Sequence, residues 1–275
     1  MPDHQVDLYL DSLVSAPLKD DRALMEFPWF SLQKRPRMEP FVYNDGRVQI
    51  RISPGEKGLA TIWDKDVLIY VATLINDRIE RGMSVERTVR FHAHDLLKVT
   101  GRGTGKRGYE LLLDALFRLR STTIETSIES ADQRERRGFG WIETWRVVER
   151  KTDSGRRVMA AIEITLNDWM FRALVHDRRV LSINSAYFKL EGALERRLYE
   201  MARKHVGQQP EWRIGLEKLA RKTGSSRGLR AFKHDLLQII ERDTIPDYRL
   251  GLEIDPDGGR PVVVIEPRVC TRARG

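Results

Sequence analysis

The feature that most constrains this chain of 275 residues is an internal repeat. When residues 67–117 are aligned without gaps against residues 190–240, apolar residues coincide at 15 positions, whereas the two compositions alone would give about nine. The coincidences step by three and four where a helix requires that spacing. A Thr-Gly dipeptide also recurs, at Thr100-Gly101 and Thr223-Gly224. A repeated pattern of this length predicts two related structural units.

Each copy predicts the same succession of an amphipathic helix, a short strand, a short helix ending at a glycine, a longer helix and a β-hairpin. In the first copy these fall at 64–81, 89–91, 94–100, 108–121, and 122–129 with 141–151, followed by a strand at 158–165. In the second they fall at 189–206, 212–214, 217–223, 226–242, and 248–254 with 261–266. Two helices joined by a short glycine-containing turn form the DNA-binding helix-turn-helix, and the added hairpin makes a winged helix. The predicted fold class is α+β, with two tandem winged-helix domains.

The repeat also predicts the domain boundaries. We expect the first winged helix at 56–175 and the second at 176–268. Residues 1–55 would form an acidic N-terminal segment and an extended lead-in strand, and residues 269–275 a tail.

The charge distribution favours a polyanionic partner. The formal net charge is +8, and residues 196–233 alone hold eleven bases against three acids. A local basic excess of this kind suits nucleic acid, although it also fits an ordinary solvated surface. The start of the chain lacks the features of a signal peptide, and no apolar run is long enough to span a membrane, so we expect a cytoplasmic protein without membrane contact.

The long helix predicted at 226–242 has two unlike faces. Its apolar residues lie within about a third of the circle at 100° per residue: Leu229, Phe232, Leu236, Ile239 and Ile240. The opposite side gathers hydrogen-bond donors: Arg227, Arg230, His234 and Gln238. Arginine can donate two hydrogen bonds to guanine, and glutamine can pair with adenine. We predict base reading by this helix, with Ser225 or Ser226 as its cap and further DNA contacts from Lys222 and Lys233; the alternative is a solvated helix face.

The equivalent helix of the first copy differs. Its exposed side is expected to carry two acids among its bases: Arg107, Glu110, Leu111, Asp114 and Arg118. The preceding glycine-rich loop offers Arg102, Lys106 and Arg107 for contacts to the DNA backbone. Arg136 and Arg137 lie in the polar connector of the predicted hairpin, which is interpreted equally well as a DNA-binding wing or as a solvated tip.

We also predict a self-association surface in the first domain, at Leu111, Trp141 and Trp145. Leu111 is expected to face solvent beside acids unsuited to DNA, and the even spacing of the tryptophans places them on one face of a strand. The alternative is that the tryptophans cover the domain's own core, as one face of a small sheet normally does.

Signals for catalysis fail on inspection. A phosphate-binding loop of the Walker type needs glycine where Thr100 stands and a hydroxyl where Arg107 stands. His92 and His94 lack companions at metal-ligand spacing, and Cys270 has no evident histidine partner. The sequence therefore predicts a protein that is not an enzyme and uses no cofactor or metal.

The run from Gly58 to Tyr70, GLATIWDKDVLIY, closely resembles the signature of the plasmid replication initiator protein A family. The segment FPWFSL at 27–32, the strand at 47–52 and the Thr-Gly-containing helix-turn-helix resemble that family too, and the likeness covers roughly residues 24–268. The resemblance implies an initiator that binds repeated double-stranded sites (iterons) at a plasmid origin and promotes opening of adjacent DNA. It also implies recruitment of the host replicative helicase and host initiator protein, and a switch between dimers and active monomers.

Two alternatives stay open at this stage. The same two domains would serve a sequence-specific transcriptional repressor, and winged helices can also act as protein-bridging adaptors that touch no DNA.

Overall fold

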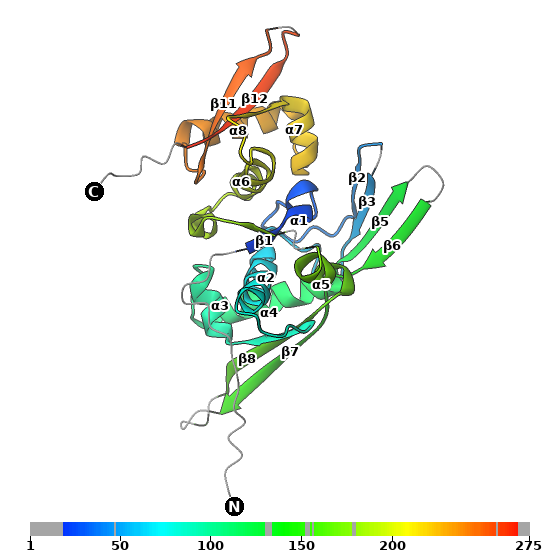
Figure 1. Ribbon diagram of the computed structural model, residues 1–275, viewed down its shortest axis with the longest axis vertical. Helices are drawn as coiled ribbons and strands as arrows, with labels where there is room; N and C mark the ends of the chain where they lie inside the picture. Colours follow the sequence, from blue (N-terminus) through cyan, green and yellow to red (C-terminus); the bar gives the residue numbers. More distant parts are fainter. Residues whose placement is uncertain are drawn as a thin grey trace, which may run out of the picture.

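A computed structural model describes residues 19–268 except 47, 130–133, 152–154, 156, 178–179 and 257. Buried side chains form two hydrophobic clusters, one drawn mainly from residues 24–174 and the other mainly from residues 183–265. Figure 1 shows the corresponding two units one above the other, with a hairpin projecting from each end of the molecule. Within the described residues, none of the helices is both long enough and apolar enough to cross a membrane.

The first unit is built on helix α2. Its residues from Lys65 to Asn76 are all buried, because the helix packs against the rest of its own unit and also against the second unit. The elements of the first unit are α2 (Lys65–Glu80), β4 (Thr88–Phe91), α3 (Ala93–Val99), α4 (Lys106–Ser121), β7 (Ile142–Lys151) and β8 (Arg157–Leu166). The three strands form an antiparallel sheet in the order β4-β8-β7, so that β7 and β8 are the wing.

The second unit repeats this plan. Its elements are α6 (Ala193–His205), β10 (Trp212–Gly215), α7 (Leu216–Thr223), α8 (Leu229–Arg242), β11 (Tyr248–Ile254) and β12 (Pro261–Pro267). The sheet order β10-β12-β11 matches that of the first unit strand for strand. The helix predicted at 189–206 is in fact a 3₁₀ helix (Ser185–Lys189) followed by α6, because the chain is extended at Gly192, whose amide donates to Glu195 Oε2 at 2.9 Å.

The predicted pairing of the first hairpin is wrong. The strand at 122–129, observed as β5 (Thr123–Glu129), pairs with β6 (Arg134–Phe139) and not with β7. The chain turns back into the core directly after β6, where the amide of Trp141 donates to the Leu119 carbonyl at 3.1 Å. A new hairpin therefore starts at β7, and β5–β6 is an insertion into the repeat.

The lead-in residues are part of the folded body. β2 (Phe41–Asn44) and β3 (Val48–Ser53) complete a four-stranded sheet in the order β2-β3-β5-β6. β1 (Lys19–Asp21) pairs with β9 (Val180–Ser182), and α1 (Arg22–Glu26) packs against α6. Helix α5 (Asp168–Val175) packs on α2. The predicted acidic start, up to residue 18, and the tail from 269 with Cys270 lie outside the described residues.

Candidate nucleic-acid interface

The helix-turn-helix of the second unit is formed by α7 and α8, joined at Gly224. This glycine has a φ of +75°, a left-handed conformation that closes α7 at little cost because glycine has no Cβ. Helix α8 buries Phe232, Leu236 and Ile239 against the second core. Its other side faces outward, away from that core.

That outward side of α8 carries free donors. Arg230 and Lys233 are exposed and form no ion pair within the described part of the chain. His234 and Gln238 are also exposed, with their Nε2 atoms 3.1 Å apart, and Arg242 donates to Gln238 Oε1 at 3.4 Å. These side chains lie on one face of one helix, as the sequence predicted, and all of them can turn toward a ligand.

The start of α8 differs from the prediction. The helix begins at Leu229, so Arg227 lies ahead of it, with Nη1 2.9 Å and 2.7 Å from the carboxylate oxygens of Asp235. Gly228 is the N-cap residue, whereas Ser225 Oγ accepts from the Arg227 amide and Ser226 Oγ accepts from Gln33. Neither serine therefore caps the helix.

Leu229 does not belong to the buried face as predicted. Its exposed fraction is 44%, because it stands in the first turn of α8, where the helix leaves the core.

Lys222 is not a free cation either. Its ammonium contacts Glu26, which also contacts Lys204, and it lies 5.9 Å from the centre of the Phe27 ring. Burial by itself would raise the pKa of Glu26, but hydrogen bonds and charges from both lysines outweigh it and lower the pKa to about 2. Lys222 thus holds α1 to the second unit. Its presence is explained by this ion pair with Glu26 and does not require a contact to DNA.

In the first unit, the glycine-rich loop before α4 is compact. A Cβ at Gly108 would overlap the carbonyl oxygen of Gly103, so the loop lies directly on the first turn of α4. Lys106 and Arg107 are 83% and 75% exposed, and both approach Glu110, at 3.9 Å and 3.4 Å. These two cations remain available at the surface, as predicted.

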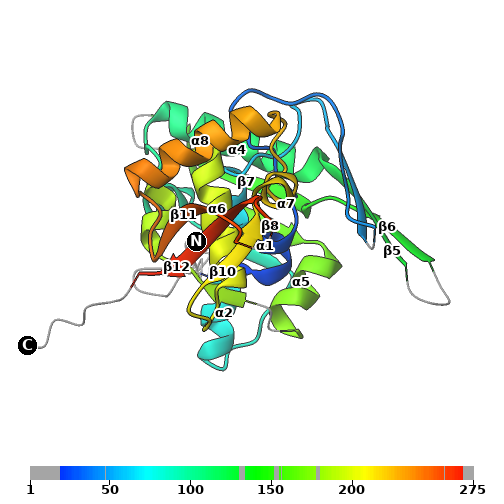
Figure 2. The same ribbon diagram turned by 90° about the horizontal axis from the view of Figure 1, so that it is seen from above.

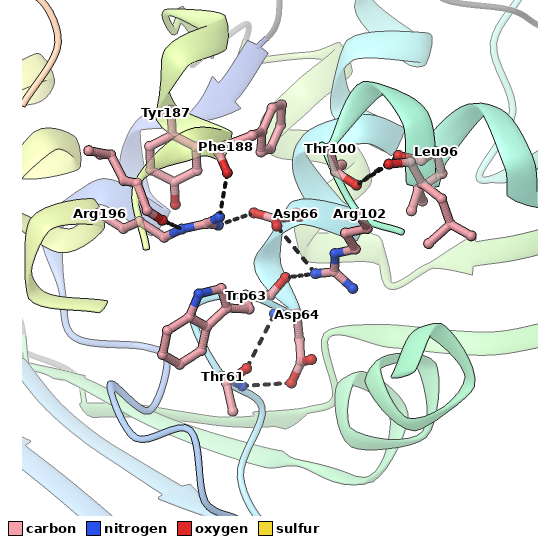
Figure 3. Close-up of polar contacts among 12 residues, drawn as sticks. Thr61, Trp63, Asp64, Asp66, Leu96, Thr100, Arg102, Tyr187, Phe188 and Arg196 are labelled. Carbon is pink, nitrogen blue, oxygen red and sulfur yellow. Dashed lines mark hydrogen bonds and ion pairs between the residues drawn. The ribbon is translucent and has the colours of Figure 1, made fainter. Parts of the chain in front are cut away.

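Arg102 of this loop departs from the prediction. Its side chain is only 17% exposed, donates to the Trp63 carbonyl and lies 3.2 Å from Asp66 Oδ2. The other oxygen of Asp66 is 2.7 Å from Arg196 Nη1 of α6 (Figure 3). Arg102 therefore joins the two units through a buried carboxylate and is not a loop cation poised for phosphate.

The outer side of α4 is less basic than expected. Arg118 is turned inward, and its Nε and Nη2 atoms each donate to an oxygen of the Asp64 carboxylate at 2.7 Å. The hydrogen bond to Asp64 and the charge of that carboxylate raise the pKa of Arg118, although burial by itself would lower it. Asp114 contacts Lys57. The exposed side retains Glu110 and Asp114, and such carboxylates repel phosphate.

The proposed self-association residues separate in the structure. Leu111 is 42% exposed, as predicted, in a hollow that Trp63 also lines. Trp141 is fully buried, stacked on Phe30 at 4.7 Å, so the prediction that it forms a dimer surface is wrong. It precedes β7 and takes no part in the strand alternation that suggested the surface. Trp145 lies on β7 and is partly buried against the first core.

Arg136 and Arg137 are exposed on β6, an edge strand of the four-stranded sheet. They line a shallow hollow together with Gln49 and Arg51 of β3. They do not belong to the wing of the first unit, which is β7–β8.

Sequence reasoning missed a second buried charge cluster between the units. Lys65 of α2 is completely buried, with Nζ 2.6 Å from Asp20 Oδ2 and 2.8 Å from Glu200 Oε1. Arg197 lies 3.2 Å from the other oxygen of Glu200. Burial alone would lower the pKa of Lys65, but the charges of Asp20 and Glu200 outweigh it and raise that pKa. The one signal in the sequence was the charged triplet at 64–66, which falls where the first helix should be apolar.

Comparisons with known proteins agree with this architecture. A family model described as Replication initiator protein A matches residues 19–250. The chain is 35% identical over 249 residues to a protein of Wigglesworthia glossinidia brevipalpis whose name assigns it to replication, with 90% of this chain and 89% of that protein covered.

Two solved structures share the fold. Domains 2 and 3 of RctB superpose with a TM-score of 0.65 at 12% identity, covering 90% of this chain and 98% of that one. The Pi initiator protein in complex with iteron DNA gives 0.52 at 17% identity, covering 76% and 90%. The predicted fold class, two tandem winged helices, is confirmed.

Proposed function

The chain belongs to the replication initiator protein A family, and we propose that it starts plasmid replication by binding repeated duplex sites at the origin. The observation that carries this proposal is the outer face of α8. A helix-turn-helix places its second helix in the major groove, and α8 presents Arg230, Lys233 and Gln238 on its outer face, where no acid of the described structure pairs with them.

The arrangement of the two units supports the proposal that both contact one duplex. Helices α4 and α8 lie toward the same edge of the molecule in Figure 2. The Pi initiator protein, whose fold is similar, was solved in complex with iteron DNA. In our proposal α8 reads bases, while Lys106 and Arg107 at the start of α4 contact the DNA backbone. Arg136 and Arg137 of β6 would add contacts to the same backbone.

The later steps are part of the same proposal. The bound protein would promote opening of adjacent AT-rich DNA and recruit the host replicative helicase and the host initiator protein, in the cytoplasm. Dimers would restrain replication and monomers would activate it. A winged helix at 56–175 and a second at 176–268, with 1–55 leading in, would be the working division of the chain.

The first test is a salt titration of binding to a duplex taken from the DNA that flanks the gene, where the proposal expects tandem repeats. With about six phosphate contacts, the slope of log affinity against log salt concentration should be near −5. A flat titration would contradict electrostatic binding to DNA.

A footprint on the same DNA separates the proposal from its main rival. An initiator should protect several direct repeats beside an AT-rich tract, in phase with the helical turn. A repressor should protect a single inverted repeat at a promoter, and that pattern would replace the initiator with a transcriptional regulator.

A further inference from the structure

The segment 31–37 is anchored at both ends and projects between them. The Ser31 amide donates to the Ala60 carbonyl at 2.9 Å, and the Ile62 amide donates to the Ser31 carbonyl at 3.0 Å. At the other end the Leu59 amide donates to the Arg37 carbonyl at 2.9 Å. Residues 33–36 between these anchors are exposed. The segment is therefore a loop of fixed position.

The loop lies between the two helix-turn-helix motifs. Gln33 Nε2 donates to Ser226 Oγ in the turn before α8 at 3.2 Å, and Gly224 of the same turn packs on Pro28. Lys34 Nζ stands 5.7 Å from the centre of the Trp63 ring, and Lys34 and Trp63 line the same hollow as Arg107 of α4. Figure 2 shows this stretch, before β2, running along the edge where α4 and α8 lie.

Two cations of the loop are not neutralised by a carboxylate of the described structure. Lys34 and Arg35 are exposed and form no ion pair within the part of the chain that the structure describes. Arg102 and Lys222, which were better candidates by sequence, are both neutralised by buried or half-buried carboxylates. Two unpaired cations on a loop of fixed position can meet an anion with little loss of conformational entropy.

We propose that Lys34 and Arg35 form a further DNA contact, which holds backbone phosphates of the duplex between the site facing α4 and the site facing α8. The inference rests on the proposed function. It adds to that function a sequence-independent clamp located in the lead-in segment, outside both winged helices. Because phosphates carry no sequence information, this clamp should contribute to affinity equally on cognate and random DNA.

The experiment compares the parent with Lys34→Ala/Arg35→Ala on a mixed-sequence 40-base-pair duplex, about four helical turns long, over a range of salt concentrations. We expect the slope of log affinity against log salt to become shallower by about 2, and the affinity at low salt to fall roughly tenfold. The control is Arg81→Ala/Arg172→Ala, which removes the same charge from exposed positions at the end of α2 and on α5. The control should retain the parent's slope.

The outcomes are distinct. Equal slopes for the two double variants would overturn the clamp, because the loss would then reflect net charge alone. An unchanged slope in Lys34→Ala/Arg35→Ala, with the parent showing strong salt dependence, would overturn the clamp and leave the proposed function intact. A parent that does not bind the duplex would overturn the proposed function and the clamp together. Unchanged circular dichroism and melting of both variants establish that folding is not the cause.

Discussion

Helices α4 and α8 hold the same place in the two winged-helix units but carry different outer faces. Each follows a short helix and a glycine-containing turn, and each buries one apolar face. On the outside, α8 offers Arg230 and Lys233 without acid partners among the described residues, whereas α4 carries Glu110 beside Lys106, and Asp114, which contacts Lys57. The difference shows that a repeated fold constrains the buried face of a helix and leaves its outer face free to diverge.

A second contrast lies between the outer faces of α4 and α8 and the seam, which is the buried junction between the two units. Arg230 and Lys233 of α8 have no acid partner within the described residues, whereas Lys65, Arg102 and Arg196 at the junction are all bound to carboxylates from another part of the chain. Figure 3 shows Asp66 held from one side by Arg102 and from the other by Arg196. Arginine and lysine thus serve two purposes here, and only burial and partners distinguish them.

The largest expected effect concerns this seam. Lys65→Ala should lower the free energy of unfolding by about 3–5 kcal/mol, because it removes the buried cation that lies within 2.8 Å of two buried carboxylates, Asp20 and Glu200. Lys57→Ala, which removes the exposed partner of Asp114, should cost less than about 1 kcal/mol. Urea unfolding measures both. Similar costs for the two variants would mean that the buried cluster does not join the units.

The next effect is acid sensitivity centred on His205. Burial and the nearby Lys222 and Lys204 lower the pKa of His205 to about 4, although Glu26 raises it, while the unfolded value is 6.5. The folded state therefore favours neutral histidine, and stability present above pH 6.5 is lost as the pH falls toward 4. At pH 5 the loss should be about 2 kcal/mol. In His205→Gln the free energy of unfolding should change much less between pH 6.5 and 5 than it does in the parent. A variant that keeps the pH profile of the parent would contradict this assignment.

Self-association sharpens the comparison between the units. Of the three residues first assigned to a dimer contact, Leu111 on α4 has an exposed side chain. If it lies in the interface, Leu111→Arg should weaken association about tenfold, or 1.4 kcal/mol. Leu237→Arg on α8 is the matched control, since Leu237 is equally exposed. Sedimentation of the parent and both variants over a range of protein concentrations measures the shift. Unchanged mass for Leu111→Arg would place the interface elsewhere.

The smallest effect is expected at the start of α4. Lys106→Ala should make the salt slope shallower by about 1 and weaken binding to cognate and random duplexes alike, because the contact is to phosphate. Loss of discrimination in Lys106→Ala would mean that the first unit also reads bases.

The sequence predicted the repeat, the helices of its two copies and the second hairpin, since these depend on local periodicity; it did not predict α1 or α5. It did not predict that β5 pairs with β6, because the polar stretch at 134–137 gave no sign of being a strand. Trp141 was assigned to a strand, whereas it lies between β6 and β7. Ion pairs were missed for a related reason. Arg102, Arg118 and Lys222 meet carboxylates 36, 54 and 196 residues away, so no local pattern could show that their charges are already neutralised.

The same limit explains Arg227. It was predicted to lie on the base-reading face, but the helix starts two residues later, and Asp235, eight residues further along the chain, holds the guanidinium. Arg230 is the better candidate for the base contact, because it lies within α8 and has no acid partner in the described structure.

The central claim is that α8 reads sequence and α4 does not. The most direct measurement is the ratio of affinities for the footprinted site and for a random duplex of equal length, in the parent, Arg230→Ala and Arg107→Ala, at one salt concentration. Arg230→Ala should cost about 1–3 kcal/mol on the footprinted site and little on random DNA, so the ratio falls. Arg107→Ala should weaken both and leave the ratio unchanged. A ratio that falls for Arg107→Ala and holds for Arg230→Ala would reverse the roles of the two units.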